Sequence, residues 1–173
     1  MSFHAVPIGD QAPEIVNVIV EIAKGGHNKY EYDETLNIIK LDRVLHSPLF
    51  YPADYGFVPQ TRADDGDHVD VMIVTDSPTF PGCLVEARVI GVLKMEDDKG
   101  GDDKILAVPA TNPHYHDVKE LKDIPSFILD GINHFFEEYK TLEKKEVRVK
   151  GWGDRAEALE IIRKAQRQFG AEA

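Results

Sequence analysis

Residues 64–74 have the sequence DDGDHVDVMIV, which places four aspartates within seven positions and continues as an apolar segment. Gly66 suits a tight turn, so Asp65 and Asp67 can project from the rim of a loop. Asp70 lies inside the apolar run, where burial of a carboxylate is costly unless a cation or strong hydrogen-bond donors receive it. The segment therefore predicts a buried β-strand that begins at an acidic rim.

The crowding of these carboxylates calls for a positive charge, because like charges at short range repel one another. Oxygen ligands without accompanying Cys or His suit a hard cation such as Mg²⁺, Mn²⁺ or Ca²⁺. The D-x-D-x-D-G order and the closing Glu of an EF-hand are missing. A solvated acidic turn is the alternative, but the position of Asp70 within a strand favours a metal site.

The composition narrows the classes of function. The chain of 173 residues is long enough for one domain with a sizeable core. Its net charge of −11 argues against a general nucleic-acid or anionic-membrane surface. The single Cys excludes an intrachain disulfide, no apolar run reaches membrane-spanning length, and the start lacks a secretory signal pattern. We therefore expect residues 1–173 to form a single, soluble domain in the cytoplasm.

Short strands are expected over most of the chain. Residues 15–23 (IVNVIVEIA) are apolar on both faces and indicate a central strand, and residues 29–33 and 36–42 follow as a hairpin. Residues 47–59 contain three prolines and four aromatic side chains, which favours an irregular but ordered segment. Further strands are expected at residues 69–74, 84–93, 105–108 and 146–150.

Two helices are expected in the C-terminal half. Apolar residues from Ile128 to Tyr139 follow the spacing of one helical face. Residues 154–157 (DRAE) resemble a capping box, and a second helix is expected to continue from there to about Gly170. Strands first and helices last predict an α+β fold with a barrel or a strongly curved sheet.

A second acidic segment, residues 95–104 (MEDDKGGDDK), lies between two expected strands. By itself such a charge run is usually a solvated hairpin loop. Two acidic turns at strand ends can, however, meet at one rim of a barrel and share metal ions. Glu21 in the central strand could pair with a lysine or with metal.

Cationic and phenolic side chains could be directed at the same rim. Taken singly, each is explained as a surface cation or a core tyrosine. Together with a metal site they would form a phosphate clamp, because ammonium and guanidinium groups bind phosphate oxygens strongly. The candidates are Lys29, Arg43, Lys104, Lys140, Tyr51, Tyr55 and Tyr139.

The pattern resembles the soluble family I inorganic pyrophosphatases in their short bacterial form. The family signature D-[SGDN]-D-[PE]-[LIVMF]-D-[LIVMGAC] corresponds to residues 65–71 (DGDHVDV), with His68 where the family has Pro or Glu. Other matches, in order along nearly the whole chain, are residues 20–22, 29–31, 42–43, 50–52, 54–57, 91–95, 134–137, 139–140 and 151–152.

The resemblance implies a five-stranded, OB-like β-barrel with flanking helices that hydrolyses pyrophosphate to two orthophosphates with Mg²⁺. The implied metal ligands are Asp65, Asp70, Asp97 and Asp102. Asp67 would be the general base for a metal-bound water, and Glu21 and Glu31 would assist it. The residues that would hold the phosphoryl groups are Lys29, Arg43, Tyr55, Lys104, Tyr139 and Lys140.

The resemblance also implies several Mg²⁺ ions per site, with Mn²⁺ or Zn²⁺ as substitutes and Ca²⁺ as an inhibitor. A water or hydroxide on Mg²⁺ would attack in line, because bound metal lowers the pKa of water. The substrate would arrive as its Mg²⁺ complex, and the chain would form a homohexamer of two stacked trimers. Two alternatives stay open: a metal-dependent phosphohydrolase acting on nucleotides or other phosphate esters, and a non-catalytic divalent-cation module. The second leaves the basic residues unexplained.

Overall fold

The centre of the fold is a mixed sheet whose strands return on themselves. The computed structural model describes residues 3–172. The sheet consists of β1 (Ile15–Ile22), β4 (Asp54–Val58), β5 (Val69–Ile73), β6 (Leu84–Asp97), β7 (Gly100–Gly101), β8 (Lys104–Pro109) and β9 (Val147–Gly153). The strands pair in the order β1-β4-β5-β8-β6-β7, and β9 also pairs with β6. Since β1 pairs with β6 as well, β1, β4, β5, β8 and β6 form a ring of five strands, which confirms the predicted architecture.

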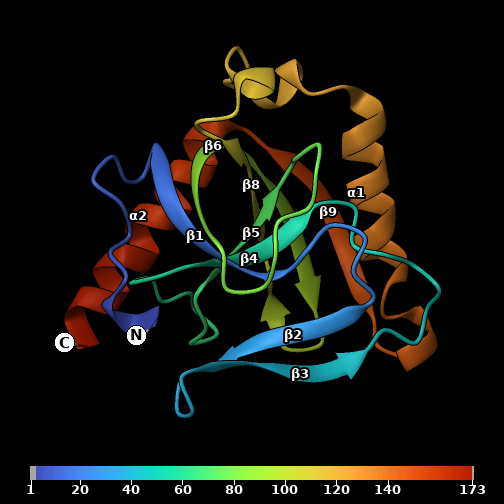
Figure 1. Cartoon of the computed structure of the whole chain (residues 1–173). Helices are drawn as coiled ribbons and strands as arrows, with labels where there is room; N and C mark the ends of the chain where they lie inside the picture. Colours follow the sequence, from blue (N-terminus) through green and yellow to red (C-terminus); the bar gives the residue numbers. More distant parts are fainter. Residues whose placement is uncertain (1–2, 173) are drawn as a thin grey trace.

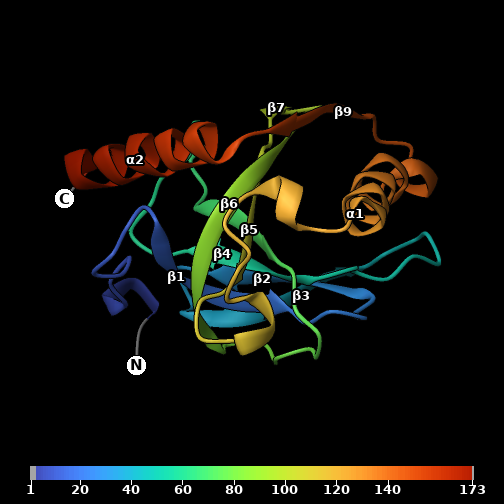
Figure 2. The same cartoon turned by 90° about the horizontal axis from the view of Figure 1, so that it is seen from above.

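The other elements lie around this ring. A separate hairpin is formed by β2 (Asn28–Asp33) and β3 (Ile38–Val44), and the two α-helices are α1 (Ser126–Glu138) and α2 (Arg155–Glu172). Short 3-10 helices are η1 (Phe3–Ala5), η2 (Pro113–Tyr115), η3 (Leu121–Asp123) and η4 (Thr141–Glu143). Figure 1 shows the hairpin across one end of the ring, with α1 and α2 on opposite sides. Figure 2 shows the two helices from above, again on opposite sides of the ring. Both α-helices lie in the C-terminal half of the chain, as predicted.

Two apolar clusters cover the two faces of the strands. Val71 of β5 and Ile162 of α2 belong to one cluster, and Met72 of β5 and Phe136 of α1 belong to the other. Neighbouring residues on a strand face opposite sides, so β5 contributes one face to the cluster of α2 and the other face to the cluster of α1. Burial of each such side chain contributes about 1.5–3 kcal/mol. This packing fixes the ring, whose end is then available for polar groups.

The strand β4 was not predicted, and the expectation of an irregular segment over residues 47–59 is wrong there. All five residues of β4 are buried, and the strand pairs antiparallel with β1 and β5. Pro52 and Pro59 flank the strand and leave its hydrogen bonds intact. Gly56 allows β4 to approach β1, because a Cβ at this position would lie 2.1 Å from the carbonyl oxygen of Ile19.

Several predicted boundaries also differ. The hairpin turn extends through Asn37, whose φ is +54°, so β3 begins later than expected. The strand β6 continues to Asp97, because β7 and β9 pair with its final residues. The strand β9 likewise continues to Gly153.

The start of α2 has the predicted N-cap. Asp154 Oδ1 accepts a hydrogen bond from Glu157 N at 2.9 Å. The Glu157 carboxylate pairs with Lys94, and among the contacts of residues 3–172 it has no return bond to Asp154 N that would complete a capping box. The helix passes through Gly170 and does not end there. Residues 1–2 and 173 of the predicted domain lie outside the described residues. Within residues 3–172, every helix is too short or too polar to cross a membrane.

Candidate active site

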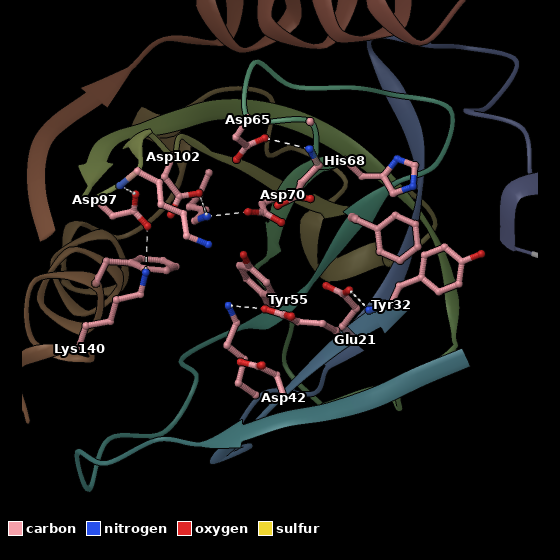
Figure 3. A pocket seen from close by; sticks show the side chains of 18 of the residues that line it. Glu21, Tyr32, Asp42, Tyr55, Asp65, His68, Asp70, Asp97, Asp102 and Lys140 are labelled. Carbon is pink, nitrogen blue, oxygen red and sulfur yellow. Dashed lines mark hydrogen bonds and ion pairs between the residues drawn. The ribbon is translucent and has the colours of Figure 1, made fainter. Parts of the chain in front are cut away.

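A polar pocket of about 610 Å³ lies between the β2–β3 hairpin and the neighbouring end of the strand ring (Figure 3). Every residue predicted for the site lines it: Glu21, Lys29, Glu31, Arg43, Tyr55, Asp65, Asp67, Asp70, Asp97, Asp102, Lys104, Tyr139 and Lys140. The fold therefore brings the predicted residues to one place, while the role of each stays a prediction.

The ring positions three of the aspartates. Asp70 lies on β5 between two buried valines, so the alternation of the strand turns its carboxylate away from their cluster. Asp97 ends β6, and Asp102 lies between β7 and β8. Figure 3 shows Asp70, Asp97 and Asp102 on the same side of the pocket. Adjacent strand ends thus gather these carboxylates.

The loop before β5 carries Asp65 and Asp67. It turns tightly at Gly66, whose φ of +91° suits glycine, and Gly66 N donates to Ala63 O at 3.0 Å. Asp65 Oδ1 accepts from Asp67 N at 3.0 Å, which fixes the two acids relative to each other. The predicted turn at Gly66 is confirmed.

The hairpin supplies cations that are already paired with carboxylates. Lys29 and Arg43 lie opposite each other in register on β2 and β3. Lys29 Nζ lies 2.8 Å from Glu31 Oε1, and Arg43 Nη1 lies 2.5 Å from Asp42 Oδ2. Burial disfavours the guanidinium, but the carboxylates of Asp42 and Glu143 raise the pKa of Arg43 above its usual value. Arg43 is therefore a permanent positive charge beside the pocket.

Lys104 is a buried cation between two aspartates. Its side chain is 3% exposed, and its Nζ lies 2.6 Å from Asp70 Oδ2 and 2.5 Å from Asp102 Oδ1. Burial by itself would lower the pKa of Lys104, but the charges of Asp70 and Asp102 outweigh it and raise that pKa above its usual value. Lys104 therefore stays protonated and holds the carboxylates of β5 and of the β7–β8 loop together.

Lys140 forms a second cation–carboxylate pair at the end of α1. Its Nζ lies 3.1 Å from Asp97 Oδ2, and both side chains are largely buried. Burial works to raise the pKa of Asp97, but the Lys99 N–H and the Lys140 ammonium hold it below its usual value. Asp97 is therefore ionised at neutral pH, and the pair joins α1 to the acidic end of β6.

The two predicted phenolic groups differ from these cations in staying neutral. Burial is the main cause that raises the pKa of Tyr55 and of Tyr139 well above the usual value. Each hydroxyl therefore keeps its proton and can donate a hydrogen bond at neutral pH. Tyr51, also a candidate, lines the pocket but is 2% exposed and packs against Phe135, with ring centroids 4.7 Å apart.

Asp67 combines exposure with an unfavourable charge environment. It lies at the surface of the pocket. Partial burial and then the charges of Asp65, Asp70 and Glu31 raise the pKa of Asp67 above that of an ordinary aspartate. A carboxylate that binds a proton more readily than usual, and that a water molecule can reach, is suited to proton transfer.

Glu21 is the most strongly perturbed acid in the pocket. The residue is 7% exposed, and its Oε1 accepts from Tyr32 N at 2.7 Å. Burial first, and the charge of Asp70 second, raise the pKa of Glu21 from 4.5 to about 8. In the metal-free protein Glu21 is therefore mostly protonated at neutral pH.

This pKa predicts how the stability of the metal-free protein depends on pH. Folded Glu21 holds a proton that the unfolded chain releases, so its contribution is complete below pH 4.5 and declines as pH rises towards 8. Glu21→Gln keeps the acceptor for Tyr32 and removes the titration. Urea unfolding in EDTA should show the variant gaining roughly 3 kcal/mol over wild type between pH 5 and pH 8. An equal difference at both pH values would contradict this assignment.

His68, which departs from the family signature, connects the acidic loop to the hairpin. Its Nε2 lies 2.8 Å from Glu34 Oε1, its Nδ1 lies 2.8 Å from Thr61 O, and its ring stacks on Phe57 with centroids 4.9 Å apart. Glu34 also pairs with Arg62 at 2.8 Å. No local pattern indicates this group of contacts, because Glu34 appears in the sequence only as a turn residue far from His68.

The chemistry of the pocket fits a hard divalent cation. Among residues 3–172, no three carboxylate, His or Cys side chains are close enough to hold a metal ion between them. Lysine ammonium groups instead contact Asp70, Asp97 and Asp102. The donors are oxygen atoms, which Mg²⁺ and related ions prefer, and they carry an excess of negative charge.

Fold and pocket together define a class of protein. A strand ring with carboxylates at its end, buried lysines and neutral phenols suits a metal-dependent hydrolase that acts on a small phosphate compound. The large pocket has few apolar side chains for a base or an acyl group.

Comparison with known proteins identifies the family. The inorganic pyrophosphatase family model matches residues 18–170. The chain is 48% identical over 165 residues to an inorganic pyrophosphatase of Thermus thermophilus, covering 94% of each, and 47% identical to one of Synechocystis, covering 98% of this chain and 99% of that protein. The crystal structure of a Thermus thermophilus inorganic pyrophosphatase superimposes with a TM-score of 0.95 at 44% identity, covering 98% of this chain and 99% of that one. The chain belongs to the inorganic pyrophosphatase family and is a metal-dependent hydrolase of the diphosphate bond.

Proposed function

We propose that this chain hydrolyses pyrophosphate to two orthophosphates with Asp67 as general base and the lysines and arginine of the pocket as the phosphate clamp. The observation that carries the proposal is the meeting, in one pocket, of an acidic group with Lys29, Arg43, Lys104 and Lys140. A pocket for cations alone has no use for these four positive charges, whereas a pocket for a metal-complexed phosphate uses both signs.

The cofactor we propose is Mg²⁺, several ions per site, with Mn²⁺ or Zn²⁺ as substitutes. Its ligands would be Asp65, Asp70, Asp97 and Asp102. When bound, such ions neutralise charge on pyrophosphate and make water more acidic.

The cations of the chain bind and orient the substrate. Lys29 and Arg43 approach from the hairpin, and Lys104 and Lys140 from the ring and the end of α1. Placed on two sides, they hold both phosphoryl groups and stabilise the charge that develops on the departing one. The hydroxyls of Tyr55 and Tyr139 donate hydrogen bonds to the same oxygens. These contacts strengthen as charge builds, which lowers the barrier.

Asp67 takes the proton of the attacking water. Its raised pKa makes it a better proton acceptor than an ordinary aspartate. Glu31, paired with Lys29, and Glu21 line the same pocket and would assist Asp67. No covalent intermediate is needed.

The assembly and location follow the same family likeness. We infer a homohexamer of two stacked trimers, one domain per chain, in the cytoplasm. Exposed apolar side chains such as Phe127, Phe50 and Leu36 provide surface that an assembly would cover. Native mass measurement tests the hexamer, and a monomeric mass at micromolar concentration would rule it out.

A phosphate-release assay tests the function and separates its alternatives. With Mg²⁺ we expect rapid release from pyrophosphate, little from ATP or p-nitrophenyl phosphate, and none in EDTA. Ca²⁺ as the sole metal should support little turnover and should inhibit the Mg²⁺ enzyme, because it is larger, accepts looser geometry and acidifies water less. Comparable rates with ATP would favour a nucleotide phosphohydrolase. Tight cation binding without any phosphate release would favour the non-catalytic module.

A further inference from the structure

Glu143 is a largely buried carboxylate that the proposed mechanism does not use. It ends η4, the 3-10 helix that follows Lys140, and Glu143 N donates to Lys140 O at 3.0 Å. Its side chain is 5% exposed, yet it lies outside the residues that line the pocket. Burial of an acid is unfavourable without a compensating partner, so the position needs an explanation.

The partner of Glu143 is Arg43, on a different element. Glu143 Oε1 lies 2.7 Å from Arg43 Nε, which is an ion-pair distance. The Nε–H does not point at this oxygen, however, so Arg43 Nε has no hydrogen-bond partner among the described residues. The other carboxylate oxygen, Glu143 Oε2, has none among them either. The contact is therefore an attraction between charges whose directional hydrogen bond is not formed in this arrangement.

The guanidinium of Arg43 is thus held at two places. Glu143 faces Nε, and Asp42 Oδ2 lies 2.5 Å from Nη1 at the other edge. Asp42 and Arg43 line the pocket, whereas Glu143, which contacts Arg43, does not. A phosphate that enters the pocket competes with Asp42 for the outer nitrogens and leaves the Glu143 side in place. A guanidinium fixed on one edge binds phosphate with less loss of side-chain freedom.

We propose that Glu143 is a positioning residue for Arg43: it anchors the Nε edge of the guanidinium so that the outer nitrogens face a phosphoryl group. The inference rests on the proposed function, because it assumes that Arg43 binds pyrophosphate. The contact between Arg43 and Glu143 also links the hairpin to the segment that carries Tyr139 and Lys140. Two parts of the proposed phosphate clamp are therefore held together by this ion pair.

A double-mutant cycle tests this role. Glu143→Gln, Arg43→Ala and the double variant are compared with wild type in kcat and KM for pyrophosphate at saturating Mg²⁺. Glu143→Gln alone should raise KM on the order of tenfold with a smaller change in kcat. In the Arg43→Ala background the same change should alter kcat/KM by less than about twofold, since Glu143 then has nothing to position. Glu143→Asp should restore part of the loss.

The control is Glu138→Gln in the same segment. Glu138 is exposed and accepts only from Thr141 Oγ1 at 3.2 Å among the contacts described, so its loss should leave KM unchanged. The Kd of inorganic phosphate, measured by calorimetry with Mg²⁺, gives a second readout and should weaken with Glu143→Gln as KM does. Thermal unfolding of each variant reports whether it is folded; should Glu143→Gln fail to fold, Glu143→Asp carries the same cycle.

The outcomes separate the two hypotheses. If Arg43→Ala keeps wild-type KM and kcat, the role of Arg43 in the proposed function is wrong. If Arg43→Ala is impaired but Glu143→Gln has the same effect in both backgrounds, Glu143 supports the fold and does not position Arg43, and the inference is overturned. An unchanged KM and phosphate Kd in folded Glu143→Gln would overturn it as well.

Discussion

Asp70→Ala should lose nearly all turnover of pyrophosphate and most of the affinity for Mg²⁺. Asp70 belongs to the proposed metal set and also accepts from Lys104 Nζ at 2.6 Å. Removal of the carboxylate therefore takes away a ligand. It also removes one of the two negative charges next to the buried Lys104 ammonium, which then repels the incoming cation more strongly. Metal assistance contributes several kcal/mol, so we expect kcat/KM to fall on the order of a thousandfold. Steady-state kinetics over a Mg²⁺ series and calorimetric Mg²⁺ titration provide the measurements.

The matched control is Asp64→Ala, a loss of the same charge at the edge of the same motif. Asp64 faces α2, where its carboxylate pairs with Lys164 at 2.7 Å and accepts from Gln168 at 3.0 Å. Its removal should leave turnover and Mg²⁺ affinity near the wild-type values. The fold should survive in Asp70→Ala as well, since Lys104 keeps its contact with Asp102. Near-normal turnover of Asp70→Ala at low Mg²⁺ would show that Asp70 is not a metal ligand.

The elements that could be predicted are those whose local pattern agrees with their surroundings. β1 and β5 are largely apolar and β-branched, and both are buried in the ring. The hydrophobic pattern and the composition of these segments therefore predicted both strands correctly. β4 could not be recognised, because its neighbouring prolines and aromatic residues indicate a loop. What makes it a strand is pairing with β1 on one side and β5 on the other, which involves residues distant in sequence. Tertiary context there outweighs local propensity.

The site shows the same division. Asp65, Asp67 and Asp70 are visible in the sequence because their spacing within one turn and strand is unusual. Asp97 and Asp102 were identified within a longer acidic run only through the family resemblance, since spacing did not separate ligands from surface acids. The partnerships of Glu143 with Arg43 and of Glu34 with His68 were not predicted at all. Each depends on how the hairpin lies against another segment, and no local pattern encodes that arrangement.

The paired charges explain how an acidic chain can bind an anion. Lys29, Lys104 and Lys140 each contact a carboxylate in this structure, so acids of the site balance the charges of these three lysines. Divalent cations at Asp70, Asp97 and Asp102 would release Lys104 and Lys140 towards phosphate oxygens. Cation binding and substrate binding should therefore strengthen each other. The metal ions draw the aspartates away from the lysines, and the phosphate draws the lysines away from the aspartates. The net charge of −11 then opposes free pyrophosphate more strongly than its less negative Mg²⁺ complex.

Asp67→Asn should lower kcat by about a hundredfold to ten-thousandfold while leaving KM and Mg²⁺ affinity close to wild type. The amide has the size of the carboxylate but cannot accept the proton of the attacking water. The charges of Asp65 and Asp70, which with burial raise the pKa of Asp67, remain in place, so the metal set is intact. The measurements are kcat and KM over a pH series, with calorimetric Mg²⁺ titration of the same protein.

Asp65→Asn is the matched control, the same substitution two positions away in the same turn. Because Asp65 is a proposed ligand, Asp65→Asn should weaken Mg²⁺ binding, and excess Mg²⁺ should restore part of its turnover. Excess Mg²⁺ should not restore the turnover of Asp67→Asn. In wild type, rates rise with pH as Asp67 loses its proton; in Asp67→Asn solvent hydroxide must replace the base, so the acidic limb should move to higher pH. If the limb stays in place, or if excess Mg²⁺ restores Asp67→Asn, then Asp67 is a ligand. Another acid that lines the pocket, such as Glu31, must then take the proton.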